Sequence, residues 1–299
     1  MVRQTTLRRE VEISGIGLHS GRRVALKLAP ATGGSGVRFR RTDLGGAEIP
    51  ASTAALDRCA YATNLRQGEA TVATVEHLLS ALYCRGVDNA EVSVDGPELP
   101  ILDGSAVPFL ELIRDAGIRD LPDPRRALEV LRPIAIVEPG KEIVVYPAPR
   151  LEVSYLIDFD HPAIGMQERT IVIDAESYAQ EVAPARTFTF VRDVEALRHL
   201  GLALGGSLTN AVVLDDHRLL NSTLRFTDEF VRHKILDLLG DLALLSAPLL
   251  GHVMAFKAGH DLHGRLVAEI LARPGAWRWV DAPPARRIGA RPAGAGSAV

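Results

Sequence analysis

The strongest constraint on the fold is a weak internal repeat on either side of a proline-rich segment at residues 121–126. In each half, apolar alternation predicts strands, then a helix that carries a histidine, then one more strand. The predicted strands lie at 24–30, 37–41 and 90–94 in the first half and at 143–147, 151–159 and 252–257 in the second. Such a repeat predicts two similar layered α+β domains, at 1–124 and 125–280, with residues 121–126 as the linker.

The second half contains an additional piece at about residues 191–216. A short helical pattern and a glycine turn are followed there by a strand pattern at 211–214, which indicates a β-α-β insert. The insert either packs on the core or forms an apolar slot for a chain-like substrate. The small and aliphatic residues expected to line the slot are Val191, Val194, Ala203, Gly206, Ser207, Ala211 and Val213.

Composition excludes several classes of protein. Of 299 residues, 47% are hydrophobic and 24% charged, as is typical of a soluble globular protein. Lys and Arg number 34 against 37 Asp and Glu, so no nucleic-acid partner is expected. Cys59 and Cys84 fit neither a disulfide framework nor a Cys-type zinc site.

The chain shows no targeting or membrane-spanning signal. Residues 1–10 lack the apolar core of a signal peptide, and the apolar run at 242–256 is interrupted and too short to span a bilayer. We therefore expect a cytoplasmic protein without a transmembrane segment, and we infer no obligate protein partner. Residues 281–299, rich in Pro, Ala, Gly and Arg, are expected to form a flexible tail.

The histidine-bearing helix of the second half spans about residues 230–241. Its leucines and isoleucine recur at helical spacing and form one apolar stripe. His233, Asp237 and Asp241 are four residues apart and form a second stripe. A His and an Asp one helical turn apart can bind one metal ion, so this pattern predicts a metal site.

The histidine-bearing helix of the first half spans about residues 74–83. Thr71 or Thr74 is a candidate N-cap, and Glu76 and His77 are neighbours near the helix start. There the histidine can reach a metal while the glutamate flanks it. If the key helices of the two halves face each other, His77 joins the metal stripe of the second half and Glu76 becomes the candidate base. Two His and one carboxylate leave a position open for water, as in hydrolytic zinc sites.

Each motif alone is more often structural than catalytic, so alternatives stay open. Two His and one carboxylate also suit the non-haem iron of an oxygenase, although an adjacent glutamate favours hydrolysis. A third hypothesis is a non-catalytic module that binds a sugar nucleotide or lipid. No feature of the sequence favours this third hypothesis.

Several blocks of the chain resemble one family along residues 2–272. These blocks are EISGIGLHSG at 12–21, TVEHL at 74–78, DNAE at 88–91, DGPELPILDGS at 95–105, ARTF at 185–188, GGSL at 205–208, HKILD at 233–237 and GH at 259–260. In this order they resemble the zinc-dependent UDP-3-O-acyl-N-acetylglucosamine deacetylases of lipid A biosynthesis in Gram-negative bacteria. One departure is Thr189, where many relatives are expected to have glycine.

The resemblance implies a fold, a reaction and roles for particular residues. The fold is a pair of layered α+β domains, each with an insert, and the active site lies at their interface. The reaction is hydrolysis of the N-acetyl group of UDP-3-O-(3-hydroxyacyl)-N-acetylglucosamine to UDP-3-O-acyl-glucosamine and acetate, the committed step of lipid A biosynthesis. The implied roles are Zn²⁺ binding by His77, His233 and Asp237, general base for Glu76, cationic or acid partner for His260, orientation of His260 by Asp241, oxyanion contact for Thr187, diphosphate contact for Lys234 and substrate contact for Phe188.

Overall fold

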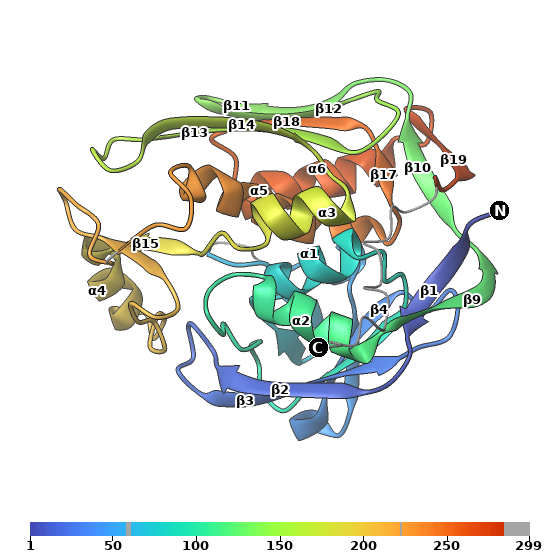
Figure 1. Ribbon diagram of the computed structural model, residues 1–299, viewed down its shortest axis with the longest axis horizontal. Coiled ribbons are helices and arrows are strands. Elements are labelled where there is room, and N and C mark those ends of the chain that lie inside the picture. The colour runs from blue at the N-terminus through green and yellow to red at the C-terminus, as the bar shows by residue number, and fades with distance from the viewer. Residues whose placement is uncertain (58–60, 222, 284–299) are drawn as a thin grey trace, which may run out of the picture.

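The computed structural model describes residues 1–57, 61–221 and 223–283. Two five-stranded sheets form the outer layers of the molecule, and the main helices lie between them (Figure 1). This arrangement confirms the expected α+β class. Among the described residues, no helix is long and apolar enough to cross a membrane.

The two large sheets have the same strand order. In the first sheet the order is β2 (Val11–Ile16), β3 (Arg23–Pro30), β8 (Ala90–Val94), β4 (Val37–Arg41) and β5 (Ala47–Pro50). In the second it is β11 (Ile134–Glu138), β12 (Lys141–Tyr146), β18 (His252–Phe256), β13 (Glu152–Phe159) and β14 (Gly165–Val172). One pair in each sheet is parallel, β4 with β8 and β13 with β18, and the other pairs are antiparallel. The repeat seen in the sequence therefore corresponds to a repeat in topology.

Each sheet is associated with two helices in equivalent places along the chain. Strand β8 lies between α1 (Glu76–Cys84) and α2 (Val107–Ala116), and β18 lies between α5 (Glu229–Leu242) and α6 (His260–Ala272). Helices α1 and α5 pack against each other in the centre, where both are buried on almost every side. The apolar stripes predicted for them form the core. Their fully or almost fully buried members are Val75, Leu78, Leu79, Leu82, Ile235, Leu238, Leu239 and Leu242.

The predicted linker is wrong as a loop, because residues 121–126 belong to two strands except for Arg125 between them. Strand β9 (Ile118–Pro124) pairs with β1 (Arg3–Leu7) in a two-stranded sheet, and β10 (Arg126–Val130) follows at once. The prolines are tolerated because β9 has a neighbour on one side only, so the missing amide hydrogens cost no ladder bond there. Strand β10 pairs with β17 (Leu249–Leu250) and with β19 (Trp277–Asp281).

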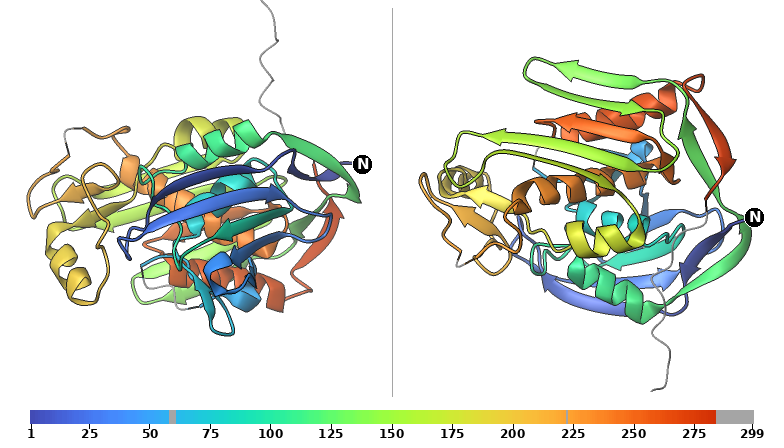
Figure 2. Two further views of the ribbon diagram at one scale, coloured as in Figure 1. Left: turned by 90° about the horizontal axis from the view of Figure 1, so that it is seen from below. Right: turned by 45° about the horizontal axis from the view of Figure 1, so that its top comes forward.

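The predicted β-α-β insert is present and begins slightly earlier than expected. Strand β15 (Phe188–Phe190) leads into α4 (Val191–His199), and β16 (Val212–Leu214) pairs with β15 in parallel. The insert lies at one end of the molecule in every view (Figures 1 and 2). Thr189 lies within β15 opposite Val213, in extended backbone that a β-branched residue readily adopts.

The remaining elements are short. They are the hairpin β6 (Leu65–Gln67) and β7 (Ala70–Val72), the turn α3 (Ala175–Ser177), and the single turns η1 (Thr42–Leu44), η2 (Thr53–Ala55), η3 (Tyr178–Val182) and η4 (Ala243–Leu245). Of the predicted tail, Asp281 pairs with Arg126 at the end of β19. The rest of that prediction, from residue 284 on, lies outside the described residues, as does Cys59.

Candidate metal centre and active site

The site forms where α1 crosses α5. Gly240 of α5 faces the backbone of Glu76, and a Cβ atom at position 240 would lie only 2.7 Å from the Cα of Glu76. A glycine in a helix interior costs about 1 kcal/mol relative to alanine. Here it allows the two helices to approach closely. As a result, the first turn of α1 lies against the C-terminal part of α5.

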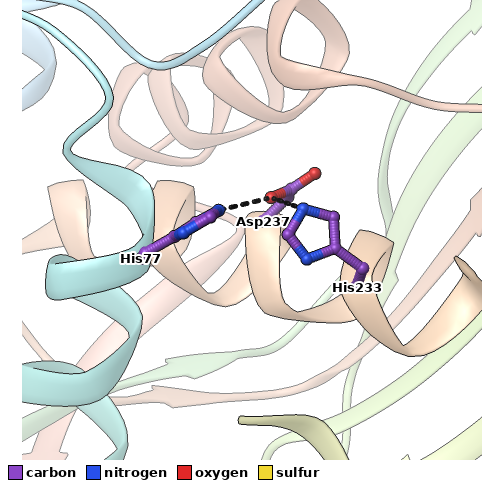
Figure 3. Close-up of side chains that lie close together, drawn as sticks. All are labelled: His77, His233 and Asp237. Atoms are coloured by element: carbon purple, nitrogen blue, oxygen red, sulfur yellow. Dashed lines mark ion pairs between the residues drawn. The ribbon is translucent and has the colours of Figure 1, made fainter. Parts of the chain in front are cut away.

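His77, His233 and Asp237 converge at this crossing (Figure 3). The Nε2 atoms of His77 and His233 lie 3.9 and 3.3 Å from Oδ1 of Asp237. One ligand atom from each residue falls within 4.8 Å of the other two, and all three residues are at most 3% exposed. Two imidazole nitrogens and one carboxylate oxygen are a donor set that divalent metals accept.

The orientation of the His233 ring is fixed by a hydrogen bond on the side that faces away from the cluster. Its Nδ1 donates a hydrogen bond to the carbonyl oxygen of Ala185, at 3.1 Å, which leaves Nε2 for the cluster. The neighbouring Arg186 holds this segment in place through Nε and Nη2 bonds of 2.8 and 3.1 Å to the buried carboxylate of Glu229. The ARTF motif at 185–188 thus acts partly as a support for a candidate metal ligand.

The protonation states of the cluster suit metal binding. Burial lowers the pKa of His77 to about 3, with His233 as a further cause, and burial also lowers the pKa of His233. Burial opposes ionisation of Asp237, but the nearby His233 and Lys234 together hold its pKa below the ordinary value. Neutral imidazoles and an ionised carboxylate are the forms that bind a metal.

Glu76 lies beside the cluster as the first residue of α1. Its side chain is 3% exposed, and Oε2 accepts a hydrogen bond of 3.0 Å from the backbone amide of Thr63. Burial raises the pKa of Glu76 to about 7. A carboxyl group that titrates near neutral pH can accept a proton and release it again, as a general base must.

The predicted helix cap at Thr71 or Thr74 is wrong. Val75 occupies the N-cap position and makes no side-chain cap bond. Thr74 instead has a left-handed backbone with φ of 58°, which is strained for a β-branched residue, and its hydroxyl donates to Glu98 at 3.2 Å. The same carboxylate accepts the backbone amides of His19 and Ser20, both at 2.8 Å. Glu98 therefore ties the glycine-rich turn at 17–21 to the start of α1.

His260 and Asp241 form the predicted pair next to the cluster. Nδ1 of His260, the first residue of α6, lies 2.8 Å from Oδ2 of Asp241, and its Nε2 lies 3.8 Å from Asp237. Burial alone would lower the pKa of His260, but the Asp241 carboxylate outweighs burial and raises it to about 9. The imidazole is therefore a cation at neutral pH. Thr63 supports the pair, because its hydroxyl donates to Asp241 and lies 3.0 Å from Nδ1 of His260.

Lys234 and Phe188 also lie near the cluster, and Thr187 precedes Phe188 in the chain. Lys234 Nζ is 2.7 Å from Oδ2 of Asp237 and 5.8 Å from the centre of the Phe188 ring. The Phe188 ring is in turn 6.3 Å from that of His233. Thr187 is held by its backbone, donating to the carbonyl of Gly104 at 2.8 Å and accepting from Val212 at 2.8 Å.

The predicted slot residues differ in exposure. Ala203 and Ala211 are buried, Val194, Gly206 and Val213 are partly buried, and Val191 and Ser207 are exposed. A cavity of about 1350 Å³ lies elsewhere, lined by Tyr83 and Cys84 at the far end of α1 and by α2. That cavity is separate from the metal cluster, which contacts the first turn of α1.

Several residues of the site were not predicted from the sequence. They are Thr63, Glu98, Ala185, Glu229 and His263. Glu98 and Ala185 lie inside blocks that carry the family resemblance, which was the available signal. His263 is three residues after His260 and therefore on the same helix face, a spacing that could have indicated it. Thr63 and Glu229 carry no comparable signal.

A buried cluster of two histidines and one carboxylate, beside a further carboxyl group of near-neutral pKa and an imidazolium, is typical of a metal-dependent hydrolase. Comparison with known proteins identifies the family. Residues 4–272 match the family model described as LpxC: UDP-3-O-acyl N-acetylglycosamine deacetylase. The chain belongs to this family, as its sequence blocks led us to expect.

Similar proteins cover almost the whole chain. A UDP-3-O-acyl-N-acetylglucosamine deacetylase of Acidithiobacillus ferrooxidans is 48% identical over 285 residues, 94% of each chain. Proteins of the same name from Geotalea uraniireducens and Legionella pneumophila are 46% and 45% identical, covering 95% and 93% of this chain and 93% of each relative. The similarity thus includes both halves of the fold and the insert.

Proposed function

We propose that this chain is a zinc-dependent deacetylase of lipid A biosynthesis that hydrolyses the N-acetyl group of UDP-3-O-acyl-N-acetylglucosamine. The observation that carries the proposal is the buried cluster of His77, His233 and Asp237 with Glu76 and His260 beside it. A base of near-neutral pKa and a cationic acid suit amide hydrolysis. They have no evident use in a binding module, and an oxygenase does not require them.

Zinc is the metal we assign to the cluster. His77, His233 and Asp237 would hold it, since zinc accepts nitrogen and oxygen donors and three protein ligands leave a position open for reaction. When bound, zinc lowers the pKa of water and polarises a carbonyl group.

The residues of the chain would carry out the proton transfers. Glu76 takes a proton from the attacking water while the oxygen of that water bonds to the acetamide carbon. Thr187 and the His260 imidazolium stabilise the charge that develops on the carbonyl oxygen. As the carbon–nitrogen bond breaks, His260 donates a proton to the leaving amine, and the products are acetate and the free amine. Asp241 keeps His260 charged and oriented.

Lys234 and the insert would bind the rest of the substrate. We assign the UDP diphosphate to Lys234, whose ammonium lies at the edge of the cluster. We assign the 3-O-acyl chain to the insert, along Phe188 and the seven predicted slot residues. We further propose the domain division at 124/125 and a cytoplasmic location, both expected from the sequence.

The slot is tested by Ala211→Trp. Ala211 is buried in the insert, so an indole there should block the acyl chain, whose buried methylenes contribute about 0.8 kcal/mol each. We expect KM for the acylated substrate to rise at least tenfold while metal content stays unchanged. Thr209→Trp, at an exposed neighbouring position, is the control. Equal kcat/KM of the wild type for substrates with and without the acyl chain would rule out the slot.

The function itself is tested by incubating the zinc-loaded chain with UDP-3-O-acyl-N-acetylglucosamine and measuring acetate. We expect stoichiometric release of acetate and of the free amine. Binding of the substrate without acetate release, by protein shown to contain zinc, would favour the binding module instead. Turnover that requires oxygen and iron would favour an oxygenase.

A further inference from the structure

A second histidine reaches Asp241 from the same helix as His260. His263 is fully buried on α6, and its Nδ1 lies 2.8 Å from Oδ2 of Asp241. This is the same oxygen that accepts the bond from His260, also at 2.8 Å. The other carboxylate oxygen accepts the hydroxyl of Thr63. Asp241 is therefore held at both oxygens, and one of its three donors is His263.

The far side of the His263 ring is anchored to the second sheet. Its Nε2 lies 3.0 Å from the hydroxyl of Tyr155 on β13, and this hydroxyl donates to the carbonyl of Ala258 at 2.8 Å. Ala258 precedes His260 by two residues and follows Lys257, whose backbone is left-handed with φ of 50°. These hydrogen bonds form a closed network. It runs from Asp241 through His263 and Tyr155 to the turn before His260, and the bond from His260 to Asp241 completes it.

Given the proposed function, we propose that His263 is a positioning residue for the deacetylation reaction. Its imidazole joins α6 to Asp241 on one side and to Tyr155 on the other. It thereby fixes the plane of the carboxylate that orients His260, and also the turn from which His260 projects. His263 contacts Asp241 and Tyr155 rather than a residue of the metal cluster, and it does not touch the substrate in this role.

Three substitutions separate the hydrogen-bond donor of His263 from the space that its ring fills. His263→Asn retains an N–H donor at the place of Nδ1, since the amide nitrogen of Asn branches from the equivalent atom. His263→Gln moves the donor outward, toward Tyr155. His263→Leu fills space without any donor. Residues that hydrogen-bond to metal ligands and orient them typically contribute 10- to 100-fold to metal affinity or activity. We expect an effect of similar size on activity from a residue that orients Asp241.

The experiment compares these variants as zinc-loaded proteins with the acetate-release assay. For His263→Leu we expect kcat to fall at least tenfold while KM and zinc content stay near wild type. His263→Asn should recover kcat to within about threefold, and His263→Gln should not. Tyr155→Phe, which removes the far anchor alone, should lower kcat less than His263→Leu. His252→Leu, which removes a histidine bonded to Ser154 on the outer face of the same sheet, is the matched control and should behave as wild type.

The outcomes are decisive for the positioning role. Near-normal kcat in His263→Leu, or an equal loss in the Asn and Gln variants, would overturn the proposal. If His263→Leu fails to fold, the Asn and Gln pair still decides. A nuclear magnetic resonance spectrum of the imidazole N–H groups gives a second reading, because the hydrogen-bonded Nδ1–H of His260 should persist in His263→Asn and disappear or shift in His263→Gln. Lack of acetate release by the wild type would count against the proposed function, whereas this spectrum would still test the positioning of His260.

Discussion

The two halves of the molecule share one strand order but contribute unequally to the site. In the first half, α1 provides Glu76 and His77 from its first turn, and α2 buries an apolar face. In the second half, α5 provides His233 and Asp237 to the cluster, and α6 brings His260 to Asp241. The repeated topology thus sets two helices against each other, and the chemistry differs between them.

This difference separates the requirements of the fold from those of the reaction. Apolar stripes on α1 and α5 are equivalent because both helices must pack between the sheets. The charged groups are asymmetric, because Glu76, the proposed base, comes from one half, whereas His260, the proposed cationic partner, comes from the other half together with Asp241. Each half alone lacks part of the site, so activity should depend on what holds the halves together.

The largest effect is expected on removal of the metal, because its proposed ligands come from both halves. A strong chelator should abolish acetate release, and added Zn²⁺ should restore it. The thermal midpoint should also fall, since a ligand present at 100 times its Kd stabilises the folded state by about 2.7 kcal/mol. Elemental analysis identifies the metal-free sample. Full activity of the metal-free sample would show that the reaction does not need a metal.

The next largest effect is expected from Glu76, the proposed base in the first half. Glu76→Gln keeps an oxygen that can accept the Thr63 amide but cannot take a proton. Turnover should fall roughly 10²- to 10⁴-fold, while zinc content and thermal midpoint stay close to wild type. Glu69→Gln, at an exposed position between β6 and β7, is the matched control. Turnover near the wild-type level in Glu76→Gln would show that another residue is the base.

The dependence of kcat/KM on pH should have an acidic limb set by a residue of the first half and an alkaline limb set by a residue of the second half. Burial raises the pKa of Glu76 to about 7, and the base must be deprotonated, so kcat/KM should rise with pH through about 7. Asp241 raises the pKa of His260 to about 9 against the effect of burial, and the acid must be protonated, so kcat/KM should fall above about 9. Outside this window the rate should change about tenfold per pH unit. His260→Gln should lose most activity together with the alkaline limb, and an unchanged alkaline limb would assign it elsewhere.

Much of this architecture could be predicted from local sequence patterns. The spacing of His233, Asp237 and Asp241 indicated one helix face, and alternation located three of the five strands in each large sheet. Strands β2, β5, β11 and β14 were not predicted. The linker prediction failed because prolines at 122 and 124 are compatible with a strand that has a single neighbour, which local sequence does not reveal. The roles of Thr63 and His263 were missed because their partners, such as Asp241 and Tyr155, are distant in sequence.

The smallest expected effect concerns the contact between the halves. Gly240→Ala places a methyl group against the backbone of Glu76, which cannot move without displacing α1. We expect a loss of about 1–3 kcal/mol in the free energy of unfolding, as for overpacked cores, together with reduced kcat because Glu76 shifts. Gly264→Ala on α6 is the matched control, since its methyl group would meet only the end of the flexible Leu56 side chain. There the gain in helix propensity, up to about 1 kcal/mol, offsets the contact. If chemical denaturation and turnover measurements give the same result for both variants, the close crossing at Gly240 does not determine the geometry of the site.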